Sequence, residues 1–351
     1  MRNEKCCAVN GVIKMLGKLR SLSFIIYHLS FRPKVAILSF IIFHLSFSSI
    51  AAQKIGLVLG GGGAKGGAEV GVLKVLEAAG VKPDYIVGTS IGSIVGGLYA
   101  AGYKAAELEQ MFCEQEWLTL ITDRRDDLSF TPYCQKDGIV YIFGFPVLDK
   151  GNTSFGVLRG ERVEQTLDSM LALKGCTRFR SLPTPFRCVA ASLMDAEEVV
   201  LSKGKLARAI RASMAIPGIF KPVDIEGMSL VDGGMMNNLP VDVCREMGAD
   251  IIIAVDLQQE KPENRPQKDN FIMGIADMLG LGALVKWVFS RPDITKYNDN
   301  RSKCDIYINP PLPDYDASSF GNENMRRMIS VGEQTARQQL PAIRRLQLPQ
   351  R

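Results

Sequence analysis

Two short apolar runs, each followed by a glycine-rich turn and an amphipathic segment, most constrain the fold of this chain. Residues 55–59 read IGLVL and lead into four glycines, and residues 85–87 read YIV and lead into the sequence GTSIG. Such short runs are typical of buried parallel strands. The segments 64–79 and 91–102, which follow the two turns, carry apolar residues at helical spacing. Because parallel strands are joined through right-handed crossovers, this order predicts a βαβα unit with a parallel sheet.

The alternation of strands and helices returns after an irregular middle region. Residues 103–185 contain scattered prolines and glycines, which suggest loops or an inserted cap. Residues 258–270 are polar and contain prolines, which is typical of a linker or a surface loop. We therefore expect an α/β fold with a central, mostly parallel sheet. The further predicted elements are strands at 186–191, 197–201, 229–232 and 251–256, and helices at 205–214, 241–247 and 322–340.

The distribution of charge argues against a nucleic-acid partner. The chain has 42 Lys and Arg against 37 Asp and Glu, but residues 1–52 contain seven of the basic residues and one of the acidic ones. The rest of the chain therefore has 35 basic and 36 acidic residues. A nucleic-acid-binding domain would carry a basic patch, and none stands out. With 46% hydrophobic and 23% charged residues, the chain is expected to be globular.

The first 52 residues are predicted to be a leader that directs export. Residues 23–31 (SFIIYHLSF) and 39–47 (SFIIFHLSF) are near copies of each other. The second copy follows two basic residues and precedes the small residues SSIAA at 48–52, so it has the layout of a signal peptide cleaved near Ala52. A membrane anchor is the alternative, although the apolar run is short for a full span. A protein exported in this way would be periplasmic, associated with an outer membrane, or secreted.

The cysteines do not predict a metal site. Six of them follow the leader, and none forms a CxxC pair. An exported protein could pair some of them as disulfides, but buried free thiols are the default expectation. The six residues are Cys113, Cys134, Cys176, Cys188, Cys244 and Cys304.

The sequence GTSIG has the pattern of a nucleophile elbow. In such a turn, strained backbone between a strand and a helix exposes the serine hydroxyl, and the flanking glycines leave room for the close turn. The positive end of the following helix would favour negative charge at the reacting centre. A tight turn without catalysis is the alternative, but the position between a strand and an amphipathic helix favours the elbow. Its residues are Gly88, Thr89, Ser90, Ile91 and Gly92.

A nucleophilic Ser90 needs a base, and the composition limits the choice. The two histidines, His28 and His44, both lie in the leader, which excludes a Ser-His-Asp triad in a cleaved protein. The base must then be a carboxylate, a lysine or another group. The best carboxylate is Asp232, which ends an apolar run and precedes Gly233 and Gly234. We expect it at the carboxyl end of a strand, where burial would raise its pKa; a turn or helix-capping aspartate is the alternative.

A glycine-rich loop offers backbone amides at the start of the first helix. Such amides can bind an anion and would form an oxyanion hole in an acyl hydrolase. The loop also matches G-x-G-x-x-G, but the next strand ends in GTS and not in the acid of a dinucleotide site. A P-loop is a still weaker alternative because no Gly-Lys-Ser/Thr follows the glycines, and we expect no nucleotide. The candidate oxyanion residues are Gly61, Gly62, Gly63, Ala64, Lys65 and Gly66.

Taken together and in this order, GGGAKG, GTSIG and DGG resemble the motifs of the patatin-like phospholipase family. Residues 212–220 (ASMAIPGIF) also resemble the family's stretch ahead of the aspartate, and the likeness covers about 54–248. The third motif is DGG, where DGA is also common in the family. The resemblance implies a three-layer fold, Ser90 as nucleophile and Asp232 as base in a Ser-Asp dyad without histidine. It also implies an oxyanion hole at the amides of Gly62 and Gly63, an acyl-serine intermediate, and no metal or organic cofactor.

The resemblance predicts a hydrolase of acyl esters in lipids or phospholipids that acts at a membrane surface. We expect the catalytic domain at 54–250 and an extension at 251–351 that completes it or packs on it. A hydrolase of small soluble esters or thioesters is one alternative. A catalytically silent lipid-binding module is another, although the intact motifs argue against it.

Overall fold

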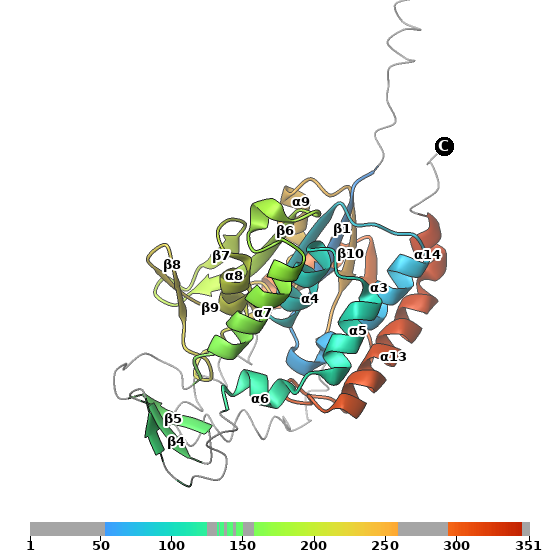
Figure 1. The fold of residues 1–351 in the computed structure, drawn as a ribbon. Coiled ribbons are helices and arrows are strands. Elements are labelled where there is room, and N and C mark those ends of the chain that lie inside the picture. Colours follow the sequence, from blue (N-terminus) through green and yellow to red (C-terminus); the bar gives the residue numbers. More distant parts are fainter. Residues whose placement is uncertain are drawn as a thin grey trace, which may run out of the picture. The chain divides into compact units, whose positions relative to one another are not determined.

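An eight-stranded mixed β-sheet forms the centre of the described chain (Figure 1). The computed structural model describes residues 53–124, 158–258 and 294–345, together with residue 132 and the short segments 134–136, 139–142 and 145–149. The predicted leader and most of the predicted linker lie outside the described residues. The strand order is β11-β10-β1-β2-β6-β9-β8, and β7 also pairs with β6. The strands are β1 (Ile55–Leu59), β2 (Tyr85–Thr89), β6 (Phe186–Ser192), β7 (Glu198–Leu201), β8 (Val223–Ile225), β9 (Met228–Asp232), β10 (Ile251–Val255) and β11 (Ile306–Ile308).

Most of the sheet is parallel, as the sequence predicted. The strands β11, β10, β1, β2 and β6 are neighbours and all run in the same direction. Their buried apolar residues alternate between the two faces of the sheet, so that Leu57 and Leu59 pack on one side and Val58 on the other. The pairings of β7 with β6, β9 with β6, and β8 with β9 are antiparallel.

The register along β6 places β2 and β9 end to end. Val189 of β6 pairs with Thr89 of β2, and the next residue, Ala190, pairs with Asp232 of β9. Strand β7 pairs with both Val189 and Ala190, so it occupies the other side of β6. The strands β2 and β9 therefore share one side of β6 and point toward each other. Asp232 does end a strand, but this strand runs antiparallel to β6. Its last residue therefore meets the carboxyl ends of the parallel strands.

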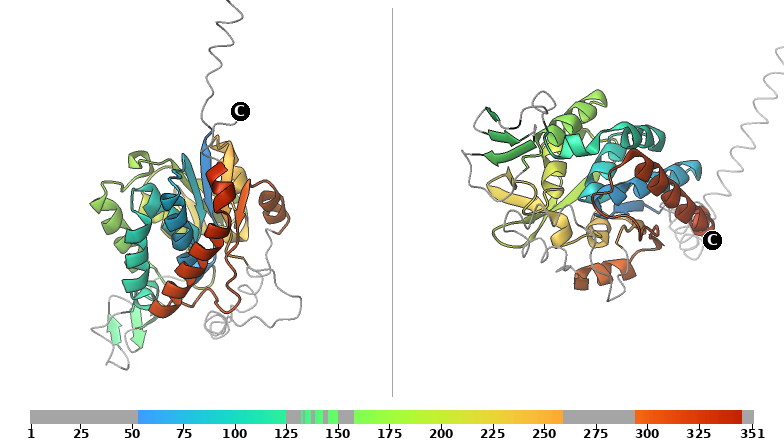
Figure 2. Two further views of the ribbon diagram at one scale, coloured as in Figure 1. Left: turned by 90° about the vertical axis from the view of Figure 1, so that its right-hand side faces the viewer. Right: turned by 90° about the horizontal axis from the view of Figure 1, so that it is seen from below.

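Helices cover both faces of the sheet and make a three-layer α/β fold (Figure 2). One face carries the larger apolar core, and the other carries a smaller core that includes Tyr297. The first core is covered by α3 (Gly67–Ala78), α4 (Ile91–Ala100), α5 (Ala105–Glu114), α8 (Leu206–Ser213) and α13 (Asn322–Gln338), and the second by α9 (Val241–Glu246) and α12 (Ile294–Ser302).

The middle region, for which the sequence suggested loops or an inserted cap at 103–185, contains helices that were not predicted. Besides α5 it contains α6 (Trp117–Ile121) and α7 (Glu161–Leu173). Both α5 and α7 bury residues at helical spacing, such as Val163, Leu167 and Leu171 of α7, and this spacing was visible in the sequence. A separate three-stranded antiparallel sheet lies between them in the chain and consists of β3 (Cys134–Lys136), β4 (Ile139–Ile142) and β5 (Phe145–Asp149).

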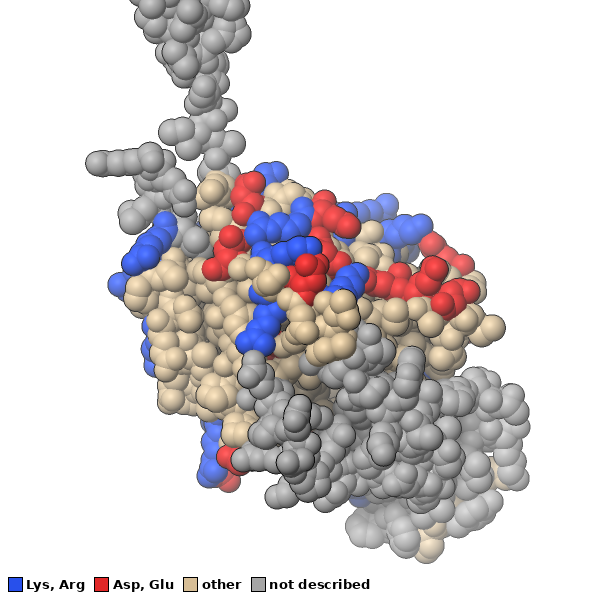
Figure 3. Space-filling view, turned by 180° about the vertical axis from the view of Figure 1, so that it is seen from behind, with Lys and Arg blue, Asp and Glu red and all other residues tan. Residues whose placement is uncertain are grey.

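The part of the chain after residue 250 contributes to the same body. It supplies the strand β10, the edge strand β11 and the helix α13, which packs on α3; the short helix α14 (Leu340–Arg345) follows. In the described part of the chain, no helix has the length and apolar character needed to span a membrane. On the surface shown in Figure 3, basic and acidic side chains of the described residues lie next to one another.

Candidate active site

The backbone at Ser90 has the strain expected of a nucleophile elbow. Ser90 lies between β2 and α4 with φ 55° and ψ −122°, outside the regions that L-residues ordinarily occupy. Its amide donates a hydrogen bond to Ser213 Oγ (3.0 Å), which helps to hold the turn. A Cβ atom on Gly88 would overlap the carbonyl of Gly92, and one on Gly92 would overlap the carbonyl of Leu59. The glycines of GTSIG are therefore required by close backbone contacts.

The structure brings Ser90 and Asp232 into direct contact. Ser90 Oγ donates a hydrogen bond to Asp232 Oδ2 (2.6 Å), and the amide of Gly234 donates to Asp232 Oδ1 (2.8 Å). The exposed fractions of Ser90 and Asp232 are 8% and 6%. Burial raises the pKa of Asp232 to about 6, and the hydrogen bonds from Ser90 and Gly234 limit this increase. The carboxylate is therefore ionised at neutral pH, yet basic enough to accept a proton.

The glycine loop supplies two amides without a protein acceptor. The amides of Gly61, Ala64 and Lys65 donate to the carbonyls of Asn238, Ala317 and Gly62, respectively. Among the described residues, the amides of Gly62 and Gly63 donate to no protein acceptor. Gly63 also lines the same pocket as Ser90. Both amides therefore remain available as hydrogen-bond donors within the described part of the chain.

An apolar pocket lies next to Ser90. Its walls come from α4, α6, α7 and the segments that follow α8 and precede α13. Apart from Ser90, Thr122 and Ser318, the pocket lining is glycine or apolar side chains. The rings of Trp117 and Phe320 lie 6.0 Å apart in a stacked arrangement. Such a surface suits a hydrocarbon chain better than a charged group.

A second hollow lies at the opposite, amino-terminal edge of the sheet. Tyr85 and Phe186, which begin β2 and β6, contribute to its lining with Arg178, Arg180 and Arg187. It contains neither member of the Ser90–Asp232 pair. We therefore assign the candidate active site to the carboxyl edge.

Several residues of this site were not identified from the sequence. Ser213 supports the elbow, and Asn237 and Asn238 lie three and four residues after the last glycine of the aspartate motif. The asparagines could have been noticed as polar residues beside DGG, but their contacts depend on the tertiary fold. The six cysteines of the described chain are free; four are buried and Cys134 and Cys304 are half-buried. Among the described residues, no cluster of three or more His, Cys, Asp or Glu could hold a metal ion.

Comparison with known proteins gives a consistent family match. Residues 57–245 match the family model described as patatin-like phospholipase. The chain is 32% identical over 207 residues to an NTE family protein of Mycobacterium tuberculosis, covering 59% of this chain and 50% of that protein. It is 34% identical over 210 residues to human patatin-like phospholipase domain-containing protein 6, covering 59% of this chain and 14% of that protein.

A fungal relative matches over a longer part of the chain. The lysophospholipase nte1 of Emericella nidulans is 28% identical over 294 residues, covering 78% of this chain and 17% of that protein. The chain thus spans half or less of the length of these curated relatives. Among solved structures, VipD from Legionella pneumophila has a TM-score of 0.45 and 15% identity, covering 83% of this chain and 67% of that one.

Proposed function

The chain belongs to the patatin-like phospholipase family, and we propose that it hydrolyses acyl esters of lipids with Ser90 as nucleophile and Asp232 as base. The observation that carries this proposal is the hydrogen bond from Ser90 Oγ to Asp232 Oδ2 at 2.6 Å, beside an apolar pocket. A family match to lipid hydrolases supports the substrate class. The geometry supports the assignment of roles.

In the proposed first step, Asp232 Oδ2 takes the hydroxyl proton while Ser90 Oγ attacks the carbonyl carbon of the ester. Negative charge develops on the carbonyl oxygen, and the amides of Gly62 and Gly63 donate to it. The carbon–oxygen bond to the alcohol then breaks, and Asp232 gives its proton to the leaving oxygen. An acyl-serine remains on Ser90.

In the second step, Asp232 takes a proton from water, and the resulting hydroxide attacks the acyl-serine carbonyl. The tetrahedral intermediate collapses, the bond to Ser90 Oγ breaks, and the proton on Asp232 returns to the serine. The products are a free fatty acid and an alcohol, which is a lysophospholipid when the substrate is a phospholipid. One carboxylate thus acts alternately as base and acid, which a pKa of about 6 permits near neutral pH.

The apolar pocket supports a substrate with a hydrocarbon chain. An acyl chain lying between Ile94, Val163 and Phe220 would leave water and gain about 0.8 kcal/mol per buried CH₂. The leader predicted at 1–52 supports export, and we propose that the protein meets lipid or phospholipid substrate at a membrane surface outside the cytoplasm.

Fluorophosphonate labelling of the purified protein tests this proposal. We expect rapid labelling of the wild type, none of Ser90→Ala, and labelling slowed by at least about 100-fold in Asp232→Asn, because loss of a general base costs about 10²–10⁴-fold. The exposed Ser202, in the hollow at the other edge, gives a matched control, Ser202→Ala, that should label normally.

The outcomes separate the proposed hydrolase from its alternatives. A folded wild type that does not label would favour a silent lipid-binding module. Labelling with no rise in ester hydrolysis when the substrate passes from monomer to micelle would favour a hydrolase of small soluble esters.

A further inference from the structure

Two adjacent buried asparagines, Asn237 and Asn238, lie five and six residues after Asp232. Their exposed fractions are 0% and 5%. Burying two amide side chains is costly unless they form hydrogen bonds, so their contacts call for a structural account. Neither side chain takes part in the proton transfers described above.

Asn238 holds the glycine loop. Its side-chain Nδ2 donates to the backbone carbonyl of Gly61 (3.2 Å). Its backbone carbonyl accepts from the backbone amide of Gly61 (3.3 Å). Gly61 in turn lies against Ser90, since a Cβ atom built on it would be 3.1 Å from Ser90 Cβ. The next two residues, Gly62 and Gly63, carry the amides that would bind the oxyanion. Asn238 therefore fixes the chain immediately ahead of those amides.

Asn238 also contacts the aspartate loop. A Cβ atom on Gly234 would lie only 2.7 Å from Asn238 Oδ1, so the side chain packs directly on the residue whose amide binds Asp232. The side chain thus lies between the loop with the oxyanion amides and the loop with the base. Both loops would move if it changed shape or hydrogen bonding.

Asn237 joins the aspartate loop to the elbow. Its backbone carbonyl accepts from Thr89 Oγ1 (2.9 Å), and its backbone amide donates to the carbonyl of Gly233 (2.9 Å). Thr89 precedes Ser90, and Gly233 follows Asp232. The backbone of Asn237 is therefore hydrogen-bonded to the chain neighbours of both Ser90 and Asp232.

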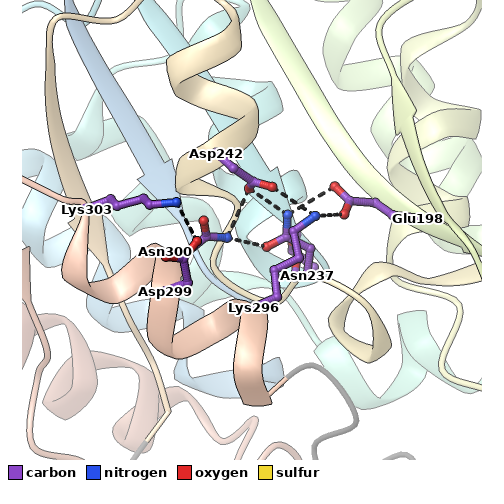
Figure 4. Close-up of polar contacts among 8 residues, drawn as sticks. Glu198, Asn237, Asp242, Lys296, Asp299, Asn300 and Lys303 are labelled. Atoms are coloured by element: carbon purple, nitrogen blue, oxygen red, sulfur yellow. Dashed lines mark hydrogen bonds and ion pairs between the residues drawn. The ribbon is translucent and has the colours of Figure 1, made fainter.

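The side chain of Asn237 is held from the other direction by a polar network (Figure 4). Its Nδ2 donates to Glu198 Oε1 (3.0 Å) and Asp242 Oδ1 (2.8 Å), and its Oδ1 accepts from Asn300 Nδ2 (3.0 Å). Lys296 of α12 pairs with both Glu198 and Asp242. The network therefore anchors Asn237 to β7, α9 and α12.

Resting on the proposed function, we infer that Asn237 and Asn238 are positioning residues that align the three catalytic loops. The nucleophile, the base and the oxyanion amides come from β2, β9 and β1, three separate strands. A displacement of about 1 Å among such groups can cost about 100-fold in rate. The asparagine pair contacts all three loops within two residues, so it sets their spacing without contacting substrate.

The test is Asn238→Asp, which keeps the shape but places a carboxylate opposite the Gly61 carbonyl, to which it cannot donate. We expect kcat on a medium-chain ester to fall about 10- to 100-fold with KM within about twofold, because the apolar pocket is unchanged. Thr89→Val, which removes the bond to the Asn237 carbonyl, should lower kcat in the same way by a smaller factor. The acid limb of the pH profile should keep its midpoint in Thr89→Val, because this variant adds no charge near Asp232 and retains the burial of its carboxyl group.

Asp84→Ala is the matched control. Asp84 Oδ2 accepts from the amide of Ile55 (2.8 Å), which ties β1 to β2 at the amino-terminal edge, far from the dyad along both strands. It should lower the thermal unfolding midpoint and leave kcat unchanged. If the wild type is active, two results would overturn this inference and leave the proposed function intact. One is an unchanged kcat in Asn238→Asp and Thr89→Val; the other is a kcat that falls as far in Asp84→Ala as in those two variants. A wild type without Ser90-dependent hydrolysis would overturn the proposed function and the inference with it.

Discussion

The two faces of the central sheet are held by different interactions. The face covered by α3, α4, α5 and α13 is packed almost entirely with apolar side chains. The face covered by α9 and α12 has a smaller apolar core and carries the Glu198–Asn237–Asp242–Lys296–Asn300 network. Apolar contacts are non-directional and stabilise the fold, whereas hydrogen bonds fix positions. The proposed alignment of the loops around Ser90 and Asp232 therefore depends on the polar face, whereas the apolar face contributes mainly to stability.

Two buried acids show how strongly the two faces differ. Glu69 of α3 has an exposed fraction of 0%, and neither carboxyl oxygen has a hydrogen-bond partner among the described residues. Burial raises the pKa of Glu69 well above its ordinary value, and the charge of Asp256 adds to this. On the polar face, burial also opposes ionisation of Asp242, but the bonds from Lys296 and Asn237 bring its pKa below the ordinary value. The pKa of the same functional group is thus raised on one face and lowered on the other.

The largest expected effect concerns close packing on the apolar face. A Cβ atom on Gly71 of α3 would overlap the backbone carbonyl of Ile329 in α13. A side-chain rotation cannot relieve this overlap, so the two helices would have to move apart. Gly71→Ala should therefore lower the free energy of unfolding by about 3 kcal/mol or more. Gly321→Ala is the control, since its Cβ would be no closer than 3.5 Å to any atom, and it should cost less than about 1 kcal/mol. Equal urea midpoints for the two variants would contradict tight packing of α3 on α13.

The next effect concerns the unpartnered acid. Glu69→Met should raise the free energy of unfolding by about 1–3 kcal/mol, because it removes a buried group without hydrogen bonds. Since the pKa of Glu69 is raised on folding, its contribution to stability is present at acidic pH and lost as the pH rises through the folded value. The gain should therefore be larger at pH 8 than at pH 5 in urea titrations. The exposed Glu323→Met should change little, and a destabilised Glu69→Met would show that the carboxyl has a structural role.

Asp232 lies between these two extremes, since it is buried but has two hydrogen-bond donors. With a pKa of about 6, the base is protonated in acid, and kcat/KM should fall tenfold per pH unit below that value, about 1.4 kcal/mol. Stability should show the opposite trend, because the contribution of a raised carboxyl pKa is present at low pH and lost as pH rises through about 6. A pH–rate profile with a neutral ester tests this, and a profile flat to pH 4 would exclude Asp232 as the base.

The smallest effect concerns the polar face. Lys296→Met removes the cation from two half-buried carboxylates and should cost about 1 kcal/mol, less than a fully buried pair because the lysine is 38% exposed. Lys303→Met, which breaks the exposed pair with Asp299, should cost only about 0.3 kcal/mol. Urea titration of the two variants measures the difference. Equal losses would mean that the network contributes no more than a surface ion pair.

Much of the fold and the dyad could be predicted because local patterns carry them. The strand at 85–87 and the GTSIG turn predicted the elbow, and the structure extends that strand only to Thr89. The sequences of α5 and α7 contain apolar residues at helical spacing, but these helices were not predicted because the region also contains many prolines and glycines. The pocket could not be predicted, because Trp117 and Phe320 stand about 200 residues apart in the chain and meet only in the folded protein.

By itself the sequence determined which groups we propose for the chemistry: a serine in a tight turn, an aspartate after an apolar run and a glycine loop, with no histidine after residue 44. These follow from residue type and short-range spacing, which fix local backbone geometry. Only the tertiary structure decided that β9 runs against β6 and meets β2 end to end, so that Asp232 reaches Ser90. It alone placed Asn237 and Asn238 between the three loops, because pairing between distant strands depends on the packing of the whole sheet.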